Sequence, residues 1–583
     1  MKRCFAPDTE LPASLLSRGT PFDGHTLAAM LDARAEAQPF DTAYTFLRDG
    51  ESVSAVWTWS ELARASRAVG AWLQAHIPPG ERALLLYPPG LDFIAGFFGC
   101  LYAGVLAVPV PPPAGGRSRR GLDRVAAIVR DAEPCCTLTS SELYEQLHRE
   151  ARGAALSTLA PGMPWLATDQ LPSVLGDDCA PMRLDGDTVA FLQYTSGSTA
   201  RPKGVMVTHG NLLHNLRAAF YLGDTHRHSV SVSWLPVTHD MGLIEGVLQP
   251  AFSGCPAYLM SPGAFLQRPA RWLRAISTYR ATRSGGPNFA YDVAVHRIAA
   301  ADRESLDLTS WESAYNGAEP IRADTLRAFA AAFAPCGFAP AAFRPCYGLA
   351  ESTLLVTSGH WRDDDNDGPV SCGAPQFGTR VRIVEPTTCR PCPDDEDGEI
   401  QVGGDSVAAG YWRRPDDTAA SFIGTALPTD SRWLRTGDLG FMRNGELFVT
   451  GRLKDLLIVR GAKHFPQDLE RTAEQRHRAV RPGGVAAVAV ANGVRGDRVA
   501  LVAEIDARRL EAGDGARLIA DLRQAIADTH GIQLHGVALV PPGTVPKTTS
   551  GKLQRFLCRD AWVNGTLDSL AMWCEGLPAG GGR

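Results

Sequence analysis

Residues 194–204 read YTSGSTARPKG, and this stretch is the strongest indication of fold and chemistry in the chain. Hydroxyl side chains, a glycine and Lys203 crowd together directly after an apolar run that predicts a buried strand over 188–194. Backbone amides freed by glycine, hydroxyl donors and one ammonium group suit a polyphosphate. The spacing is not that of a Walker A loop. A Ser/Thr-rich turn with a solvated lysine explains the segment equally well, so both interpretations stay open here.

Apolar runs alternate with helical periods around this loop. The periodicity predicts helices over 27–37 and 59–76, a strand over 43–47, and a further buried strand over 229–235. Alternation of this kind is typical of parallel strands joined by crossover helices. We therefore predict an α/β fold for the larger part of the chain.

One uncharged stretch, FIAGFFGCLYAGVLAVPV from Phe93 to Val110, reaches the lower length limit of a membrane span. Three glycines and Pro109 interrupt it. A helix of about a dozen residues that turns at Gly104 into a buried strand over 105–110 explains it better. The N-terminal residues lack the apolar core of a secretory signal. We expect a soluble, cytoplasmic protein without stable membrane insertion.

The pattern of predicted strands and helices changes after Gly440. Short strands bracketed by glycines and charges are followed by predicted strands over 484–491 and 499–505 and a helix over 516–529. We therefore predict two domains and a tail. These are a large N-terminal domain of stacked α/β subdomains over residues 1–452, a small, mobile C-terminal α+β domain over 453–565, and a frayed tail over 566–583.

Composition excludes several classes of function. The chain of 583 residues has 58 Lys and Arg against 63 Asp and Glu, a net charge of −5, which provides no electrostatic footprint for nucleic acid. Its 13 cysteines are scattered rather than arranged as a disulfide scaffold. Cys389 and Cys392 form a C-x-x-C pair without a second pair of ligands, so we interpret them as loop thiols rather than a zinc site.

An acidic string imitates a calcium loop. Residues 363–368 read DDDNDG and place aspartates at alternate positions before Gly368. An EF-hand needs a bidentate glutamate at the twelfth position, where Ala374 stands. We interpret the string as a solvated loop.

Four further segments could bind a nucleotide, although each is weak by itself. YGLAES at 347–352 could stack an aromatic ring on a base, and NGAEP at 316–320 is as readily an ordinary turn. TGDL at 436–439 is followed by GRLKD at 451–455. The aspartate of TGDL could accept hydrogen bonds from ribose hydroxyls, or it could stabilise its own turn. PKTTSGKLQR at 546–555 is a basic loop of the kind that is usually solvated.

The order and content of these segments together resemble the adenylate-forming superfamily, over roughly residues 25 to 560. Within it, several strings resemble the fatty acyl-AMP ligase branch: GCLYAGVLAVPVPPP, WLPVTHDMGLIEGVLQP, GGPNFAYD, RPCYGLAESTL, VSCGAP, GRLKDLLIVRGAKHFPQDLE and PKTTSGKLQR. The resemblance implies an ATP- and Mg²⁺-dependent ligase that converts a fatty or related carboxylic acid to acyl-AMP and releases pyrophosphate. It would then pass the acyl group to the phosphopantetheine of a separate holo acyl carrier protein, in lipid, polyketide or lipopeptide biosynthesis.

Two alternatives to this function remain open. One is an acyl-CoA ligase that uses the same adenylate, because the segment Thr357–Val370, which would hinder CoA in this branch, is short here. The other is a non-catalytic nucleotide-binding module, against which the intact lysines argue. Ala200 and Ser352 are small departures from the usual glycine and threonine of the superfamily.

The resemblance also implies roles for individual residues. The phosphate-binding loop would comprise Thr195, Ser196, Gly197, Ser198, Thr199 and Lys203. Gly317, Ala318 and Tyr347 would hold the adenine, Asp438 the ribose with Arg452 nearby, and Ser352 would face the α-phosphate. Glu351 would hold Mg²⁺, Lys454 would be the hinge of the small domain, and Lys552 the catalytic lysine.

Four residues are expected to line the substrate pocket. His239 would line it or gate the pantetheine, with a structural role as the alternative, since adjacent His239 and Asp240 are not expected to orient each other as a catalytic pair. Met241, Phe289 and Tyr291 would form apolar wall, although residues of these types are core in most proteins.

Overall fold

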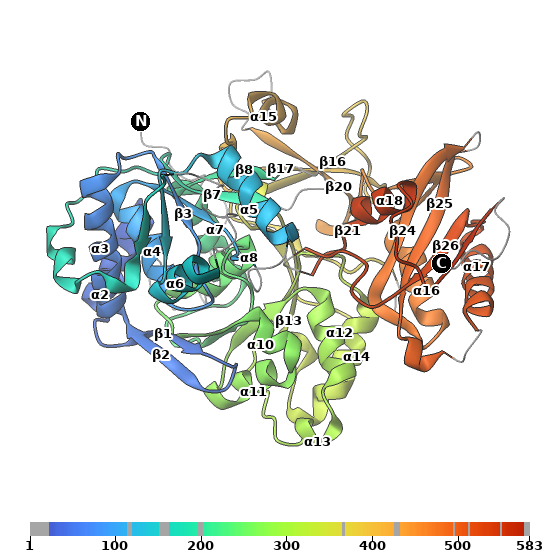
Figure 1. Cartoon of the computed structure of the whole chain (residues 1–583), viewed down its shortest axis with the longest axis horizontal. Helices are drawn as coiled ribbons and strands as arrows, with labels where there is room; N and C mark the ends of the chain where they lie inside the picture. The colour runs from blue at the N-terminus through green and yellow to red at the C-terminus, as the bar shows by residue number, and fades with distance from the viewer. Residues whose placement is uncertain are drawn as a thin grey trace.

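Four β-sheets organise the part of the chain that the computed structural model describes. That part comprises residues 22–113, 119–150, 162–195, 202–363, 368–424, 432–493, 496–510, 514–548 and 551–575. Three sheets belong to the N-terminal part, and the fourth forms a separate unit at the opposite end of the longest axis (Figure 1).

The largest sheet has nine strands, and its six central strands run parallel. Helices between successive parallel strands make the crossovers that such pairing requires. Across the sheet the strands are β15 (Ala374–Pro375), β14 (Leu355–Ser358), β13 (Phe343–Gly348), β12 (Ser313–Asn316), β11 (Arg283–Gly286), β9 (Ser231–Ser233), β10 (Ala257–Met260), β1 (Thr42–Leu47) and β2 (Val53–Thr58). The associated helices are α8 (Asp240–Leu243), the π-helix η4 (Ile244–Leu248), α9 (Gln249–Ser253), α10 (Pro262–Gln267), α11 (Ala270–Tyr279), α12 (Asn288–Arg297), α13 (Ala300–Arg303) and α14 (Ala323–Phe333).

The second sheet has seven strands and is parallel except at one edge. In order they are β18 (Gly410–Tyr411), β8 (Lys203–Thr208), β7 (Val189–Thr195), β4 (Leu106–Pro109), β3 (Arg82–Leu85), β5 (Cys136–Thr139) and β6 (Trp165–Ala167). Its helices are α2 (Leu27–Ala37), α3 (Trp59–His76), α4 (Asp92–Ala103), α5 (Arg119–Ala132), α6 (Ser141–Glu150) and α7 (His209–Leu222). The helices predicted over 27–37 and 59–76 are confirmed. A capping box between Thr58 and Glu61 begins the second of them.

The apolar stretch from Phe93 to Val110 is a helix, a turn and a strand, as predicted. Gly104 ends α4 with a φ of 65°, a left-handed conformation that favours glycine, and β4 follows at Leu106. Among the described residues, no helix is long and apolar enough to cross a membrane.

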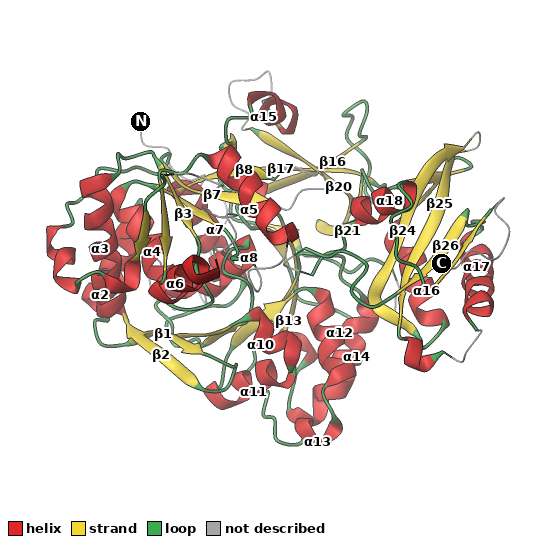
Figure 2. Cartoon of the chain, viewed as in Figure 1, coloured by secondary structure: helices red, strands yellow, loops and turns green. Residues whose placement is uncertain are grey.

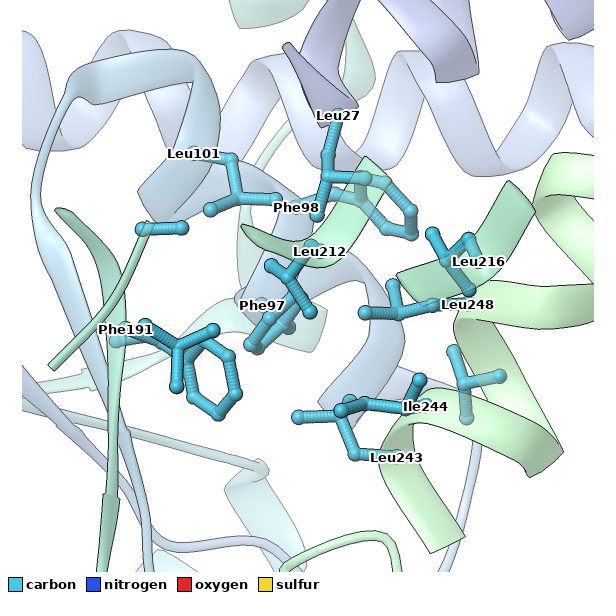
Figure 3. Close-up of a cluster of buried hydrophobic side chains, with 14 of the residues drawn as sticks. Leu27, Phe97, Phe98, Leu101, Phe191, Leu212, Leu216, Leu243, Ile244 and Leu248 are labelled. Atoms are coloured by element: carbon cyan, nitrogen blue, oxygen red, sulfur yellow. The ribbon is translucent and has the colours of Figure 1, made fainter. Parts of the chain in front are cut away.

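A large apolar core joins helices of the two sheets. Figure 3 shows Phe97 and Phe98 of α4 packed near Leu212 and Leu216 of α7 and near Leu248 of η4. All five side chains are fully buried, each burial being worth roughly 1.5–3 kcal/mol. This core fixes α7 and η4, which form part of the wall of the functional site described below.

The third sheet is antiparallel and completes the N-terminal part. Its strands are β16 (Arg380–Val384), β17 (Gly398–Gly403), β20 (Trp433–Arg443), β19 (Phe422–Ile423) and β21 (Glu446–Arg452), and α15 (Pro415–Ser421) lies beside it. Short 3₁₀ helices connect elements throughout the chain: η2 (Thr168–Gln170), η3 (Ser173–Asp178), η5 (Ala334–Cys336), η6 (Pro340–Ala342), η7 (Ala350–Ser352) and η8 (Ala507–Arg509).

The C-terminal unit is a mixed sheet with helices on both faces (Figure 2). Alternate strand residues pack against α16 and α17 on one face and against α18 on the other. Its elements are β22 (Leu457–Val459), β23 (Ala462–His464), α16 (Pro466–Arg476), β24 (Val480–Gly493), β25 (Gly496–Ile505), α17 (Gly515–His530), β26 (Gly536–Val540), α18 (Arg555–Val563) and β27 (Ala571–Cys574).

The prediction of a frayed tail from residue 566 is wrong for its first part. β27 pairs antiparallel with β26 and places Trp573 opposite Val537. The guanidinium of Arg523 in α17 lies 3.4 Å from the centre of the Trp573 ring. A strand that pairs with the sheet and carries a stacked tryptophan is held in place rather than frayed.

Candidate active site

A cavity of about 480 Å³ lies where the C-terminal unit meets the N-terminal part. Its walls come from β7, β8, α7, α8, β11 to β14, the strands around Asp438, and the loop before α18. Of the residues predicted for the site, those that line it are Thr195, Lys203, His239, Met241, Ala318, Tyr347, Glu351, Arg452, Lys454 and Lys552. Segments more than 300 residues apart in the sequence therefore converge on one space.

Two strands flank the loop that is predicted to bind phosphates. Thr195 ends β7 and pairs with Lys203 at the start of β8. The Lys203 ammonium donates to Asp417 at 2.7 Å and lies 4.8 Å from the centre of the Tyr411 ring. The predicted loop residues Ser196, Gly197, Ser198 and Thr199 lie outside the described residues.

Asp438 joins the groups predicted for the adenosine. The Tyr347 hydroxyl donates to one of its carboxylate oxygens, and Arg452 Nε donates to the other, both at 2.8 Å. Neighbouring strands impose this arrangement, because Asp438 of β20 stands opposite Arg452 of β21. Asp438 raises the pKa of Arg452, and burial, followed by Asp438, raises the pKa of Tyr347. The Asp438 carboxylate is thus held between two donors, Tyr347 and Arg452, that line the cavity, while Asp438 itself does not line it.

The turn after β12 takes the backbone close to Cys346 of β13. A Cβ at Gly317 would lie 2.6 Å from Cys346 Sγ, so only glycine fits. Ala318 adopts a φ of 68° and lines the cavity. Gly317 itself does not line the cavity, whereas Ala318 and Tyr347 do.

Glu351 and Ser352 share the 3₁₀ turn η7 but have different surroundings. Glu351 lines the cavity, and its carboxylate accepts a 2.9 Å hydrogen bond from the Tyr411 hydroxyl. Burial raises the pKa of Glu351. Ser352 is fully buried and does not line the cavity, so the expectation that it faces the α-phosphate does not fit this structure. The tight turn directs successive side chains to different sides.

Lys552 reaches the same cavity from the C-terminal unit. Its loop is closed by Thr548, whose hydroxyl accepts from Lys552 N at 3.1 Å and whose amide donates to Lys552 O at 2.8 Å. Burial, followed by the charge of Arg452, lowers the pKa of Lys552, while Asp240 and Asp438 oppose the shift. A lysine from one structural unit therefore lies among acidic and basic groups of the other.

Ion pairs hold the two units together beside the cavity. Arg322 donates to Glu474 of α16 at 3.2 Å, and Arg471 of α16 contacts Asp324 of α14. Lys454 lies in the connecting segment between β21 and β22, is exposed, and lines the cavity.

His239 and Asp240 contact each other, contrary to expectation. His239 Nδ1 lies 2.6 Å from Asp240 Oδ1, because His239 caps α8 in an extended conformation and Asp240 is the first residue of that helix. Burial raises the pKa of Asp240, but His239, Lys552 and the Met241 amide outweigh it, and the pKa is lowered overall. Asp240 thus presents a carboxylate at the cavity wall that interacts electrostatically with Lys552.

Phe289 and Tyr291 were predicted as pocket wall, and neither lines the cavity. Tyr291 is fully buried, donates to Tyr315 O at 2.9 Å and packs edge-on against Trp272. Phe289 lies against Trp234 and beneath Gly551. Tyr291 therefore belongs to the aromatic core of the nine-stranded sheet, and the half-buried Phe289 packs against that core.

Sequence reasoning missed Tyr411, Asp417 and Glu319. The first two contact Glu351 and Lys203 from β18 and α15, and no motif marks them. Glu319 accepts from the amide of Phe289 at 2.6 Å. Burial raises the pKa of Glu319 to about 6, while the Phe289 amide, Arg322 and Lys552 oppose that shift. Glu319 lies in the NGAEP segment, in which only Gly317 and Ala318 were predicted to belong to the site.

The raised pKa of Glu319 predicts a pH-dependent stability. Its folded pKa of about 6 exceeds the ordinary 4.5, so ionisation costs the folded state free energy as pH rises through this window. We expect Glu319→Gln to increase the free energy of unfolding by about 2 kcal/mol above pH 7 and to have no effect below pH 4. Denaturant unfolding at a series of pH values measures this. A difference that does not change with pH would contradict the assignment.

The fold and this cavity are those of an enzyme that uses a nucleotide to activate its substrate. The family model described as "AMP-binding enzyme" matches residues 31–412, and the model "Disco-interacting protein 2-like, AMP domain" matches 454–572. The chain belongs to the AMP-binding enzymes and, within them, to the fatty acyl-AMP ligases.

Individual relatives support that placement. The chain is 42% identical over 93% of its length to the medium-chain-fatty-acid–[acyl-carrier-protein] ligase JamA of Moorena producens, covering 96% of that protein. It is 36% identical to the long-chain-fatty-acid–AMP ligase FadD26 of Mycobacterium marinum, over 92% of this chain and 97% of that one. The fatty acyl-adenylate ligase of Legionella pneumophila, solved with acyl adenylate and pyrophosphate, superposes with a TM-score of 0.71 at 36% identity and covers 97% and 99% of the two chains.

Proposed function

We propose that this ligase uses ATP and Mg²⁺ to convert a fatty acid to acyl-AMP and then transfers the acyl group to the phosphopantetheine of a separate acyl carrier protein. The observation that carries the proposal is the convergence of Lys552, Glu351 and Tyr347 on one cavity. A cationic side chain from the C-terminal unit thus meets the groups suited to a nucleotide.

The first half-reaction joins two anions. A carboxylate oxygen attacks the α-phosphorus, the bond to the β-phosphate breaks, and pyrophosphate leaves. The acid is already ionised, so no protein base is needed, and the main requirement is positive charge near the carboxylate and the α-phosphate. In this proposal Lys552 supplies it from the small unit and Lys203 binds the departing phosphates, and both lysines line the same cavity. In this proposal Asp438 binds the ribose and Tyr347 the adenine, and the hydrogen bond between the two side chains supports their acting together.

The Glu351 carboxylate is suited to be one ligand of a magnesium ion whose other ligands are mainly phosphate oxygens. Mg²⁺ is bound in such sites by one or two carboxylates together with substrate oxygens and water. Glu351 is the carboxylate that the η7 turn brings to the cavity, and Tyr411 holds one of its oxygens.

The second half-reaction requires the small unit to move. The pantetheine sulfur attacks the acyl carbon, AMP leaves, and the thiol proton is released. Lys552 occupies the cavity in this structure, so its loop must withdraw for the thiol to approach. Lys454, in the connecting segment, is the proposed hinge.

Stiffening the hinge should separate the two half-reactions. We expect Lys454→Pro to leave adenylate formation within about threefold of wild type, because Lys552 is already in place. The rate of thioester formation should fall about tenfold or more, because proline restricts its own φ and the residue before it. Single-turnover measurements of each step make the comparison. Equal losses in both steps would place the hinge elsewhere.

The choice of a carrier acceptor is supported by the name of the relative JamA, an [acyl-carrier-protein] ligase. In the test, enzyme loaded with acyl-AMP is mixed separately with holo carrier protein, with the matched apo carrier protein and with CoA. We expect acyl transfer to the holo carrier, with none to the apo carrier or to CoA. Acyl-CoA formation at a rate equal to that with holo carrier would make the protein an acyl-CoA ligase instead.

A further inference from the structure

The inner part of the active-site cavity is lined by buried polar groups. Glu245 of η4, Arg283 of β11, and Ser313 and Tyr315 of β12 all border it. Each is at most 7% exposed. A pocket that accepted only a saturated hydrocarbon chain would have apolar side chains here, because burying polar groups without partners is costly.

The strand geometry places these groups away from the reacting carboxylate. Arg283 and Ser313 are paired at the starts of the parallel strands β11 and β12. Gly317 and Ala318, predicted for the adenine, follow the other end of β12, whose last residue, Asn316, lies about 10 Å from Ser313 at roughly 3.3 Å per residue. Because side chains alternate along a strand, Ser313 and Tyr315 share one face of the sheet.

Arg283 and Glu245 form a closed ion pair. Arg283 Nη2 donates to Glu245 at 2.5 Å, and Nη1 donates to Thr225 Oγ1 at 2.9 Å and to Gly223 O at 3.2 Å. The guanidinium carbon lies 5.5 Å from the centre of the Tyr315 ring. The positive charge of Arg283 is therefore already neutralised within the protein.

Several polar atoms of the cavity lining have unused hydrogen-bonding capacity. Arg283 Nε and Ser313 Oγ are among those that are buried and form no hydrogen bond with any described residue. A buried guanidinium N–H and a hydroxyl without partners cost free energy that a ligand oxygen would recover. Apolar side chains also border the cavity, among them Leu222, Met241 and Leu354.

We propose that the preferred substrate is a fatty acid that carries a neutral oxygen function, a hydroxyl or a keto group, on its chain beyond the carboxyl end. This inference rests on the proposed function. The oxygen accepts from Arg283 Nε and bonds to the Ser313 hydroxyl, while the apolar side chains contact the hydrocarbon. A second carboxylate does not fit, because Glu245 already neutralises Arg283 and the added charge would be buried without a partner.

The test uses purified wild-type enzyme and pairs of acids of equal chain length. Each unsubstituted acid is compared with its hydroxy and keto derivatives at every position from the middle of the chain to its end, and with the dicarboxylic acid. Acyl-AMP is measured by mass spectrometry with ATP and Mg²⁺. For at least one position we expect kcat/KM to exceed that of the unsubstituted acid about tenfold or more, since a site built to bond an oxygen discriminates against the analogue that lacks it.

Substitutions in the inner cavity connect the preference to these residues. Ser313→Ala should reduce the ratio of kcat/KM for the oxygenated acid to kcat/KM for the unsubstituted acid about fivefold. Ser305 is exposed, and Ser305→Ala is the matched control that should preserve this ratio. The paired change Glu245→Leu with Arg283→Met replaces the ion pair by apolar groups and should favour the unsubstituted acid; its melting temperature reports folding.

The outcomes distinguish this inference from the proposed function. If the kcat/KM of each unsubstituted acid equalled or exceeded that of every oxygenated acid of the same length, the inference would be overturned, while the ligase activity would stand. A preference that Ser313→Ala and the paired change leave unaltered would assign it to other residues and would also overturn the inference. Absence of adenylate with every acid would contradict the proposed function itself.

Discussion

Replacement of Lys552 by alanine is expected to lower the rate of acyl-adenylate formation about 100-fold or more while the protein remains folded. Lys552 lies on a loop of the C-terminal unit and lines the cavity together with Arg452, whose guanidinium donates to Asp438. A carboxylate and an α-phosphate repel each other, and removal of one preorganised electrostatic stabiliser from such a site typically costs about 3–4 kcal/mol. The reaction should be followed in a single turnover with saturating ATP.

The control lies on the same loop. Lys547 is exposed and does not line the cavity, so Lys547→Ala should keep the rate within about twofold of wild type. If Lys552→Ala kept near-normal activity, Lys552 would not belong to the site. Matching melting temperatures for the two variants would establish that any loss arises in catalysis rather than in folding.

Glu351→Gln is expected to lower kcat/KM for ATP about 100-fold and to raise the Mg²⁺ concentration needed for half-maximal rate. Glutamine retains the shape of the side chain and can still accept from the Tyr411 hydroxyl, so the η7 turn should be preserved. What is lost is the negative charge that a hard dication prefers in its ligand. Initial rates across a Mg²⁺ series separate loss of metal affinity from loss of catalysis.

Exposed Glu304 provides a comparison for that substitution. Glu304→Gln removes the same charge from the surface and should leave the Mg²⁺ dependence unchanged. An unaltered Mg²⁺ dependence in Glu351→Gln would remove Glu351 as a metal ligand.

Local patterns in the sequence were sufficient for much of the fold. The helices over 27–37 and 59–76 follow from apolar periodicity, and the capping box at Thr58 fixes the start of the second. The turn at Gly104 follows from a glycine between two apolar runs. These elements could be predicted because the interactions that define their ends lie within a few residues.

Contacts across long sequence distances could not be predicted in this way. The partner of Lys203 is Asp417, which is 214 positions away, and nothing in its local sequence marks it. Tyr291 was assigned to the pocket because its type suits either wall or core, and only the packing of α12 decides between them. The β27 strand has only four residues, so its pairing with β26 depends on tertiary structure.

The most direct test of the account is detection of the adenylate itself. Purified enzyme, ATP and Mg²⁺ are mixed with a pool of fatty acids that includes saturated and oxygenated members, with CoA in one tube and none in the other. Mass spectrometry should reveal equal amounts of acyl-AMP in both tubes, matched by pyrophosphate, and no acyl-CoA. If neither tube contained acyl-AMP or pyrophosphate, the central claim that this cavity activates a fatty acid with ATP would be contradicted.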